Sequence, residues 1–243
     1  MDLLRDDTLL AVFTHRETYL PGLLASIRTH LAGHPILVVD RNGPINANMH
    51  ALWRSLRKSG YRWWVFLDDD IEFLGGDVLH ECALAMLRNG WAGTSIYSTF
   101  DPQWGRDSYD AARADLLQSG AIAEKEAGWM TGYFMLVDSH QVGHIEPDLD
   151  LPDANTAIDT SYSVAMRAQG FTIGLVPHVC YHTRKDVQAN VEVIHRAERY
   201  LMEKWGRFYW QNTQYTGCVL EWPRPDYHVD QPLPDNALPE CFQ

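Results

Sequence analysis

The stretch Trp63-Trp64-Val65-Phe66-Leu67-Asp68-Asp69-Asp70 is an apolar run that ends in three adjacent carboxylates. Its aromatic and β-branched residues predict a strand buried on both faces, as in a parallel sheet. The acids then lie at the carboxyl end of the strand, where open α/β sheets bind ligands. Adjacent carboxylates repel one another unless a cation or hydrogen-bond donors neutralise them. The stretch therefore predicts a site for Mn²⁺ or Mg²⁺ and a diphosphate, and the alternative is a solvated acidic turn.

The chain before this strand has the pattern of a βαβ unit. Strands are predicted over residues 8–14 and 35–39 and helices over residues 19–31 and 46–58, the second of which leads into the Trp63 strand. This order predicts the start of a doubly wound sheet. We expect the first two strands to flank the Trp63 strand with their carboxyl ends.

The chain after the acids continues the alternation and predicts a single α/β domain. Its patterns predict helices over residues 76–89, 109–117, 158–169 and 187–205, and strands over residues 91–100, 128–137 and 171–176. We expect one domain over residues 1–221, followed by a proline-rich tail over residues 222–243.

Composition narrows the possible partners and the compartment. Thirty-two acidic residues against twenty basic ones give a formal net charge of −12, which disfavours broad attraction to nucleic acid or anionic membrane. The four cysteines are widely spaced and form no C-x-x-C pair, so neither a disulfide framework nor a zinc ribbon is indicated. No export signal and no apolar run of about 20 residues is visible. We expect a soluble, cytoplasmic protein without integral membrane association.

The usual phosphate-binding and nucleophile motifs are missing. The sequence contains no G-x-x-x-x-G-K-[ST] loop, no G-x-G-x-x-G after the first strand and no G-x-S-x-G elbow. If phosphates bind to this chain, a metal ion is therefore expected to hold them.

Three further positions carry candidate site residues. The ends of the first two strands carry candidate contacts for a nucleobase and a ribose: Thr14, with the loop His15-Arg16, and Asp40. The alternative for an acid after a strand is a turn or cap residue. Asp159 opens a predicted helix, where the alternative is an acid favoured by the helix dipole.

The third position is the segment His178-Val179-Cys180-Tyr181-His182. In an extended chain His178, Cys180 and His182 share one face, which admits a zinc site. The plentiful carboxylates favour a harder ion, so His182 is expected to share a metal with Asp70. The alternative for His182 is a strand-end histidine bonded to a backbone carbonyl. Two basic residues that follow are expected to lie close to the phosphates: Arg184 and Lys185.

These motifs together resemble a nucleotide-sugar glycosyltransferase of the GT-A fold, closest in pattern to the large family-two type. Four landmarks carry the resemblance in the expected order: residues 11–16, residues 38–43, the D-x-D-like Phe66-Leu67-Asp68-Asp69-Asp70, and residues 177–182. The ending Lys204-Trp205-Gly206 is also similar. The resemblance implies a Rossmann-like, mixed but mostly parallel sheet flanked by helices.

The resemblance also implies roles for individual residues. The Glu-Asp pair that often supplies the base in such enzymes corresponds here to Ile158-Asp159. Residues 128–132 would line the sugar and acceptor side, with aromatic stacking on a sugar or base expected from Trp104, Trp129 and Tyr133. The implied nucleotide contacts are Thr14, Arg16, Asp40, Asp68, Asp69, Arg184 and Lys185; the metal ligands are Asp70 and His182, and the general base is Asp159.

The implied activity is transfer of a sugar from a nucleoside diphosphate sugar, with a UDP-sugar favoured, to an acceptor hydroxyl with inversion. A saccharide is the favoured acceptor, and a lipid-linked sugar, a protein or a hydroxylated DNA base remain open. One alternative is a sugar-phosphate nucleotidyltransferase, which would normally have a glycine-rich loop after the first strand. Another is a non-catalytic nucleotide- or carbohydrate-binding protein.

Overall fold

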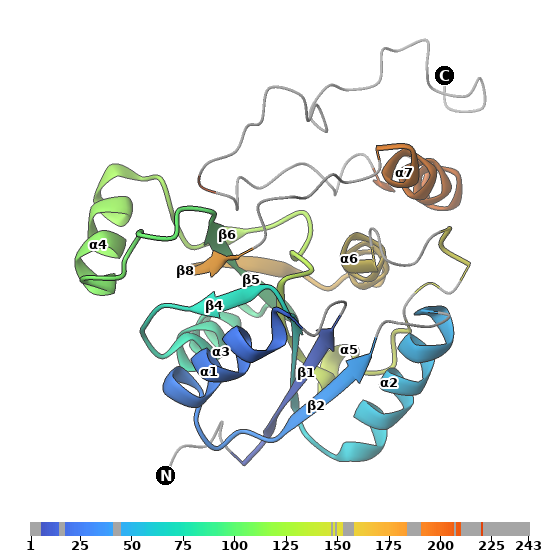
Figure 1. Cartoon of the computed structure of the whole chain (residues 1–243). Helices are drawn as coiled ribbons and strands as arrows, with labels where there is room; N and C mark the ends of the chain where they lie inside the picture. Colours follow the sequence, from blue (N-terminus) through green and yellow to red (C-terminus); the bar gives the residue numbers. More distant parts are fainter. Residues whose placement is uncertain are drawn as a thin grey trace.

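The fold is a mixed α/β sheet with helices on both faces (Figure 1). The computed structural model describes residues 6–14, 18–40, 45–146, 148, 150–152, 158–183, 191–206, 208–209 and 220. Within these residues, eight strands form one sheet: β2-β1-β3-β7-β5-β8-β4 in order, with β6 paired to β8. The predicted tail over residues 222–243 lies outside them.

The amino-terminal half confirms the predicted βαβ pattern. It consists of β1 (Thr8–Thr14), α1 (Leu20–His30), β2 (Ile36–Asp40), α2 (Ile45–Ser59) and β3 (Trp63–Asp68). β1 pairs in parallel with both β2 and β3. The expectation that the first two strands flank β3 is wrong in one respect, because the other neighbour of β3 is the antiparallel strand β7.

The carboxyl-terminal half matches the predicted order and adds three short elements. Its elements are β4 (Ile71–Phe73), α3 (Val78–Asn89), β5 (Gly93–Thr99), α4 (Tyr109–Ser119), β6 (Lys125–Glu126), β7 (Phe134–Asp138), α5 (Ser139–Val142), α6 (Ile158–Ala168), β8 (Ile173–His182) and α7 (Val191–Trp205). The additions are β4, β6 and α5, each too short to leave a periodic pattern in the sequence. Asp77 and Ser108 cap the starts of α3 and α4 through their side chains, and left-handed Gly90 and Gly120 end these helices.

β8 is longer than the predicted strand over residues 171–176. Its pairing with β5 shifts between Ile96 opposite Val176 and Tyr97 opposite Val179, which places Pro177 and His178 in a bulge. Proline is tolerated there because a bulge residue needs no ladder hydrogen bond. The strand therefore continues past Pro177 and carries its last residue, His182, to the edge of the sheet.

Five strands share one direction, as a mostly parallel sheet requires. β2, β1, β3, β5 and β8 run one way, and β7, β4 and β6 run the other. The carboxyl ends of β1, β3, β5 and β8 thus meet at one edge, beside the start of β7. This edge holds most of the candidate site residues.

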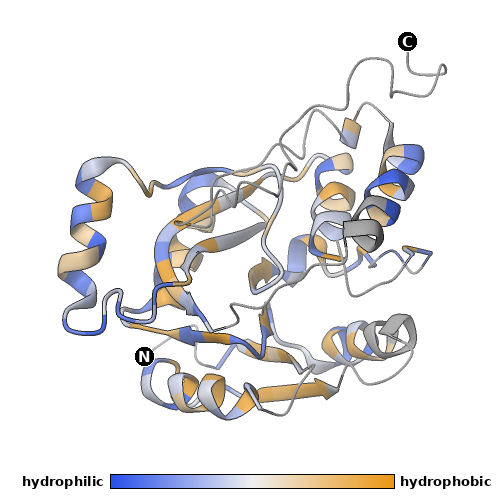
Figure 2. Cartoon of the chain, turned by 45° about the horizontal axis from the view of Figure 1, so that its top comes forward, coloured by the Kyte–Doolittle hydropathy of each residue, from blue (hydrophilic) through white to orange (hydrophobic). Residues whose placement is uncertain are grey.

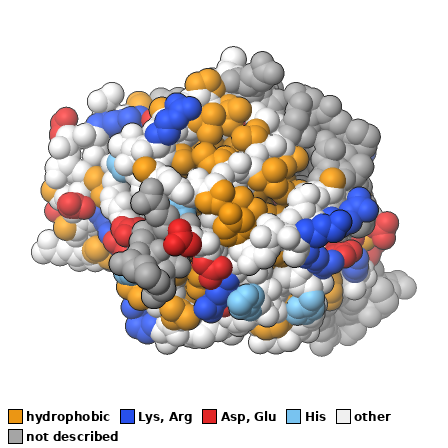
Figure 3. All heavy atoms as spheres, turned by 90° about the horizontal axis from the view of Figure 1, so that it is seen from below, with side chains coloured by type: hydrophobic (Ala, Val, Ile, Leu, Met, Phe, Trp, Pro, Cys, Tyr) orange, Lys and Arg blue, Asp and Glu red, His pale blue; other side chains and the backbone are white. Residues whose placement is uncertain are grey.

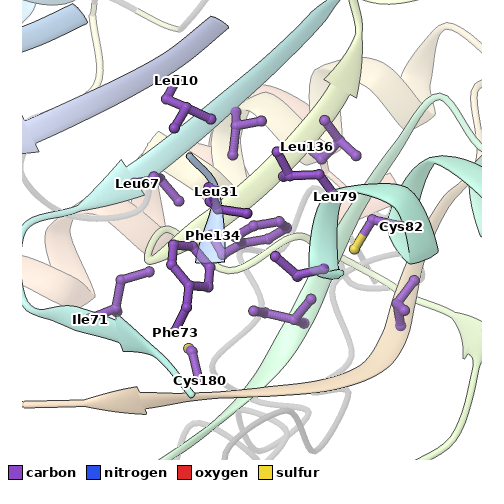
Figure 4. Packing of buried hydrophobic residues seen from close by; sticks show 14 of the residues in the cluster. Leu10, Leu31, Leu67, Ile71, Phe73, Leu79, Cys82, Phe134, Leu136 and Cys180 are labelled. Carbon is purple, nitrogen blue, oxygen red and sulfur yellow. The ribbon is translucent and has the colours of Figure 1, made fainter. Parts of the chain in front are cut away.

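Two apolar layers hold the helices to the sheet. On one face α1 and α3 pack on residues such as Leu10, Leu67 and Phe134 (Figure 4), and on the other face α2, α5 and α6 pack around Phe66. The strands are predominantly apolar, whereas the helices mix apolar and polar residues (Figure 2). β3 is buried on both faces, as its sequence predicts. α7 packs on α6 through a separate cluster that includes Val164 and Leu201.

The surface carries a few exposed apolar side chains. The view from below shows apolar side chains gathered in the middle of that face (Figure 3). In the described part of the chain, the exposed large apolar residues are Ile36, Val38, Leu84, Leu87 and Leu117. Within that same part, no helix has the length and apolar character needed to cross a bilayer.

Candidate active site

The ends of β1, β2 and β3 bring four of the predicted nucleotide contacts to one edge: Thr14, Asp40, Asp68 and Asp69. The strand register places Thr14 opposite Asp40 and Phe13 opposite Asp68, so Thr14 is level with Asp69. The Thr14 hydroxyl donates a hydrogen bond of 2.8 Å to Asp69 Oδ2. Both side chains are buried, with Asp69 only 4% exposed. Asp69 is therefore engaged within the protein and fixes the acidic turn against β1.

The Thr14–Asp69 hydrogen bond makes a stability prediction. Thr14→Val keeps the shape of the side chain but removes the donor to a buried carboxylate. We expect it to lower the free energy of unfolding by about 1.5–3 kcal/mol, the usual range for hydrogen bonds to charged groups. Urea unfolding measures this change. Thr14→Ser is the matched control, since it keeps the hydroxyl; equal losses in the two variants would contradict the assignment.

The predicted metal ligands Asp70 and His182 lie side by side. β4 pairs with β8, so Ile71 is opposite His182. The Thr183 amide and the Thr183 hydroxyl both donate to the Asp70 carbonyl, at 2.7 and 2.9 Å respectively. His182 Nε2 is 3.2 Å from Asp70 Oδ1. A carboxylate oxygen and an imidazole nitrogen this close can bind one divalent ion together.

Two protein ligands suit a metal that also binds a diphosphate. Among the residues that the structure describes, no group of three or more His, Cys, Asp or Glu side chains is placed to hold a metal ion. Mn²⁺ or Mg²⁺ in substrate complexes typically uses one or two carboxylates and fills its shell with phosphate oxygens and water. The donor set therefore fits such an ion better than a metal held only by protein.

The alternative zinc triplet does not assemble. His178 is fully buried, with Nδ1 3.6 Å from Glu81 Oε2, and its ring contacts Tyr109. The pKa of Glu81 is lowered to about 2 by its contact with His178 and by its ion pair with Arg113. Burial lowers the pKa of His178 itself. Cys180 lies in the apolar core. His178 and Cys180 are thus structural residues, and only His182 reaches the edge.

Asp159 is held by a loop that precedes β7. The Gly132 amide donates to Asp159 Oδ2 and the Thr160 amide to Asp159 Oδ1, both at 2.8 Å. Ser163 ties the same loop to α6, because its hydroxyl accepts from the Met130 amide and donates to the Asp159 carbonyl. A Cβ on Gly132 would lie 3.3 Å from Asp159 Oδ2, so glycine permits this close approach. Asp159 thus lies in the first turn of α6 with its carboxylate bonded to the loop, and its role as a general base stays a prediction.

The same loop connects Asp159 to the acidic turn. Tyr133 follows Gly132, and its carbonyl accepts a hydrogen bond of 3.3 Å from the Asp68 amide. The Tyr133 hydroxyl donates to the Ile96 carbonyl and the side chain is 6% exposed. The expectation that Tyr133 stacks on a sugar is therefore wrong, because its ring is buried. Gly132 belongs to the segment 128–132 that the sequence placed on the acceptor side, whereas no sequence pattern pointed to Ser163, because its hydrogen bond to the Met130 amide is long-range.

Several predicted site residues lie outside the described part of the chain. The structure places the backbone of Asp40 at the end of β2 but does not describe its side chain. The remaining undescribed candidates are Arg16, Arg184 and Lys185.

The fold is a Rossmann-like α/β fold of the kind found in glycosyltransferases. No family model matches the sequence, and no curated protein matches it either. Among solved structures, the chain resembles a mannosyltransferase from Pyrobaculum calidifontis in complex with GDP-Man and Mn²⁺, with a TM-score of 0.56 and 15% identity over 83% of this chain and 63% of that one. The chain thus spans less than two thirds of that protein. A197 from STIV has a TM-score of 0.47 and 14% identity over 70% of this chain and 81% of that chain, a likeness too weak to define a fold.

Proposed function

We propose that this chain is a metal-dependent glycosyltransferase that uses a nucleoside diphosphate sugar. The observation that carries the proposal is the pair of Asp70 Oδ1 and His182 Nε2, 3.2 Å apart at the carboxyl edge of the sheet. Ligands bind at this edge in open α/β sheets. The mannosyltransferase with a similar fold was solved with GDP-Man and Mn²⁺, which supports the same class of donor and ion here.

The residues divide into two groups with different chemical tasks. Asp70 and His182 would hold Mn²⁺ or Mg²⁺, which when bound neutralises the charge on the departing diphosphate. Asp159, on α6, is the proposed general base that accepts the proton of the acceptor hydroxyl. Attack from the face opposite the diphosphate gives an inverted anomeric configuration. We assign nucleotide contacts to Thr14, Arg16, Asp40, Asp68, Asp69, Arg184 and Lys185.

The structure adjusts how two of these contacts act. Asp69 is bonded to Thr14, so we propose that this pair supports the nucleotide pocket by fixing the acidic turn. Asp68, which is partly exposed at the end of β3, is the better placed of the two for direct contact with a ribose. The sequence favoured a uridine nucleotide, whereas the solved neighbour holds a guanosine nucleotide. Titration with each of the two nucleotides distinguishes between a uracil and a guanine base.

Calorimetry tests the proposal directly. The purified chain is titrated with GDP and with UDP, each in the presence of Mn²⁺ and again after chelation with EDTA. We expect one nucleotide to bind only with the metal, because the adjacent carboxylates otherwise repel the diphosphate. Equal binding after chelation would contradict the metal role. Metal-dependent binding of a nucleotide without hydrolysis or transfer of the matching nucleotide sugar would indicate a binding protein instead.

A further inference from the structure

The imidazole of His182 is in contact with two aromatic rings. The Phe100 ring stacks on it with centroids 5.0 Å apart and planes 18° apart. The Tyr133 ring is tilted by 50° with its centroid 5.6 Å away. The His182 side chain is only 15% exposed, and its Nε2 faces Asp70. Its environment therefore restricts rotation of the imidazole while leaving Nε2 beside a carboxylate oxygen.

Both aromatic residues are fixed by the sheet. β5 and β8 pair in parallel with Thr99 opposite Tyr181, so the next residues, Phe100 and His182, emerge beside each other. Tyr133 is held at both ends, by its hydroxyl on the Ile96 carbonyl at 2.7 Å and by its own carbonyl on the Asp68 amide. Tyr133 thus contacts the acidic turn through its backbone carbonyl, and β5 and His182 through its side chain.

We propose that Phe100 and Tyr133 are positioning residues that set the orientation of His182 as a metal ligand. This inference rests on the proposed function, since it concerns the same metal. A ligand imidazole must keep its nitrogen aimed at the ion, and mutation of the residues that orient a ligand typically costs about 10–100-fold in metal affinity. Here aromatic contact supplies that support. The face of Phe100 limits rotation of the imidazole, and Tyr133 keeps the imidazole in register with Asp68-Asp69-Asp70.

The test measures metal binding and ligation with Mn²⁺ as the probe. Electron paramagnetic resonance titrations are made with Mn²⁺ and whichever of GDP and UDP binds the wild type. Phe100→Ala is expected to weaken Mn²⁺ affinity by about 10-fold, as for other supporting residues of metal sites. The electron spin-echo modulation caused by the imidazole nitrogen, measured for each bound Mn²⁺ ion, should also decrease. Phe100→Tyr keeps the stacked ring and should restore both values. His182→Ala identifies the nitrogen signal by removing it.

Controls separate positioning from general destabilisation. Arg62→Met breaks the ion pair with Asp138 at the other end of β3 and should lower the melting temperature without changing Mn²⁺ affinity or nitrogen modulation. Phe100→Leu keeps apolar volume but lacks a ring face, and serves where Phe100→Ala does not fold; it too should reduce nitrogen modulation.

The outcomes distinguish this inference from the function on which it rests. If the wild type binds no Mn²⁺ with either nucleotide, the proposed function fails and this inference fails with it. If the wild type binds Mn²⁺ but the folded Phe100 variants keep full affinity and full nitrogen modulation, only the positioning role is overturned. Mn²⁺ binding without any imidazole signal also overturns it, while the role of Asp70 stands.

Discussion

Asp159→Asn is expected to reduce turnover by about 10²–10⁴-fold, the usual contribution of positioned general-base catalysis. The substitution removes the proton acceptor and keeps one oxygen, which can still accept from the Gly132 amide, whereas the hydrogen bond from the Thr160 amide to the other oxygen is lost. Affinity for the donor should change little, because Asp159 is assigned to the acceptor side. Turnover is measured as release of nucleoside diphosphate from the donor sugar, and donor affinity by calorimetry.

A neighbouring carboxylate provides the control for Asp159. Asp148 accepts hydrogen bonds from Tyr200 and Lys204 on α7 and is thereby committed to structure, so Asp148→Asn should keep normal turnover. Near-normal turnover in Asp159→Asn would refute the base assignment. Retention of anomeric configuration in the product, seen by NMR, would refute the inverting mechanism. If Asp159 is refuted, the next carboxylates to test are Asp150 and Asp153, between α5 and α6, the second of which lies outside the described residues.

Asp70→Ala is expected to abolish the metal-dependent binding of the nucleotide. Mutation of residues that only support a metal ligand costs about 10–100-fold in affinity, and loss of a direct ligand should cost at least the upper end of that range. The fold should survive, because Thr183 binds the backbone carbonyl of Asp70, which the variant keeps. Calorimetric titration of Mn²⁺ with GDP or UDP measures the loss.

His182→Ala gives the matched comparison. It removes the neutral ligand and leaves the carboxylate, so it should weaken Mn²⁺ binding less than Asp70→Ala. Circular dichroism and melting curves establish that both variants fold. An unchanged Mn²⁺ titration in folded Asp70→Ala would show that the acidic run is a solvated turn.

The sequence predicted most of the elements because their patterns are local. The periodicity of residues 19–31 and 46–58 predicted α1 and α2 to within one or two residues of their observed ends. The apolar run before Asp68 likewise predicted β3 and its burial. Short elements such as β4 were missed because three residues cannot show a period, and β4 exists through its pairing with β8.

For the candidate site, too, some features followed from the sequence and others only from the tertiary structure. The sequence by itself identified the candidate residues, since carboxylates and imidazoles at strand ends are recognisable without coordinates. Only the tertiary structure decided which of them meet: Asp70 with His182, Thr14 with Asp69, and Asp159 with Gly132. It also decided that His178 faces Glu81 while His182 reaches the edge of the sheet. The physical reason is that strand register and the bulge at Pro177 are set by pairing between segments far apart in the chain, which no local pattern encodes.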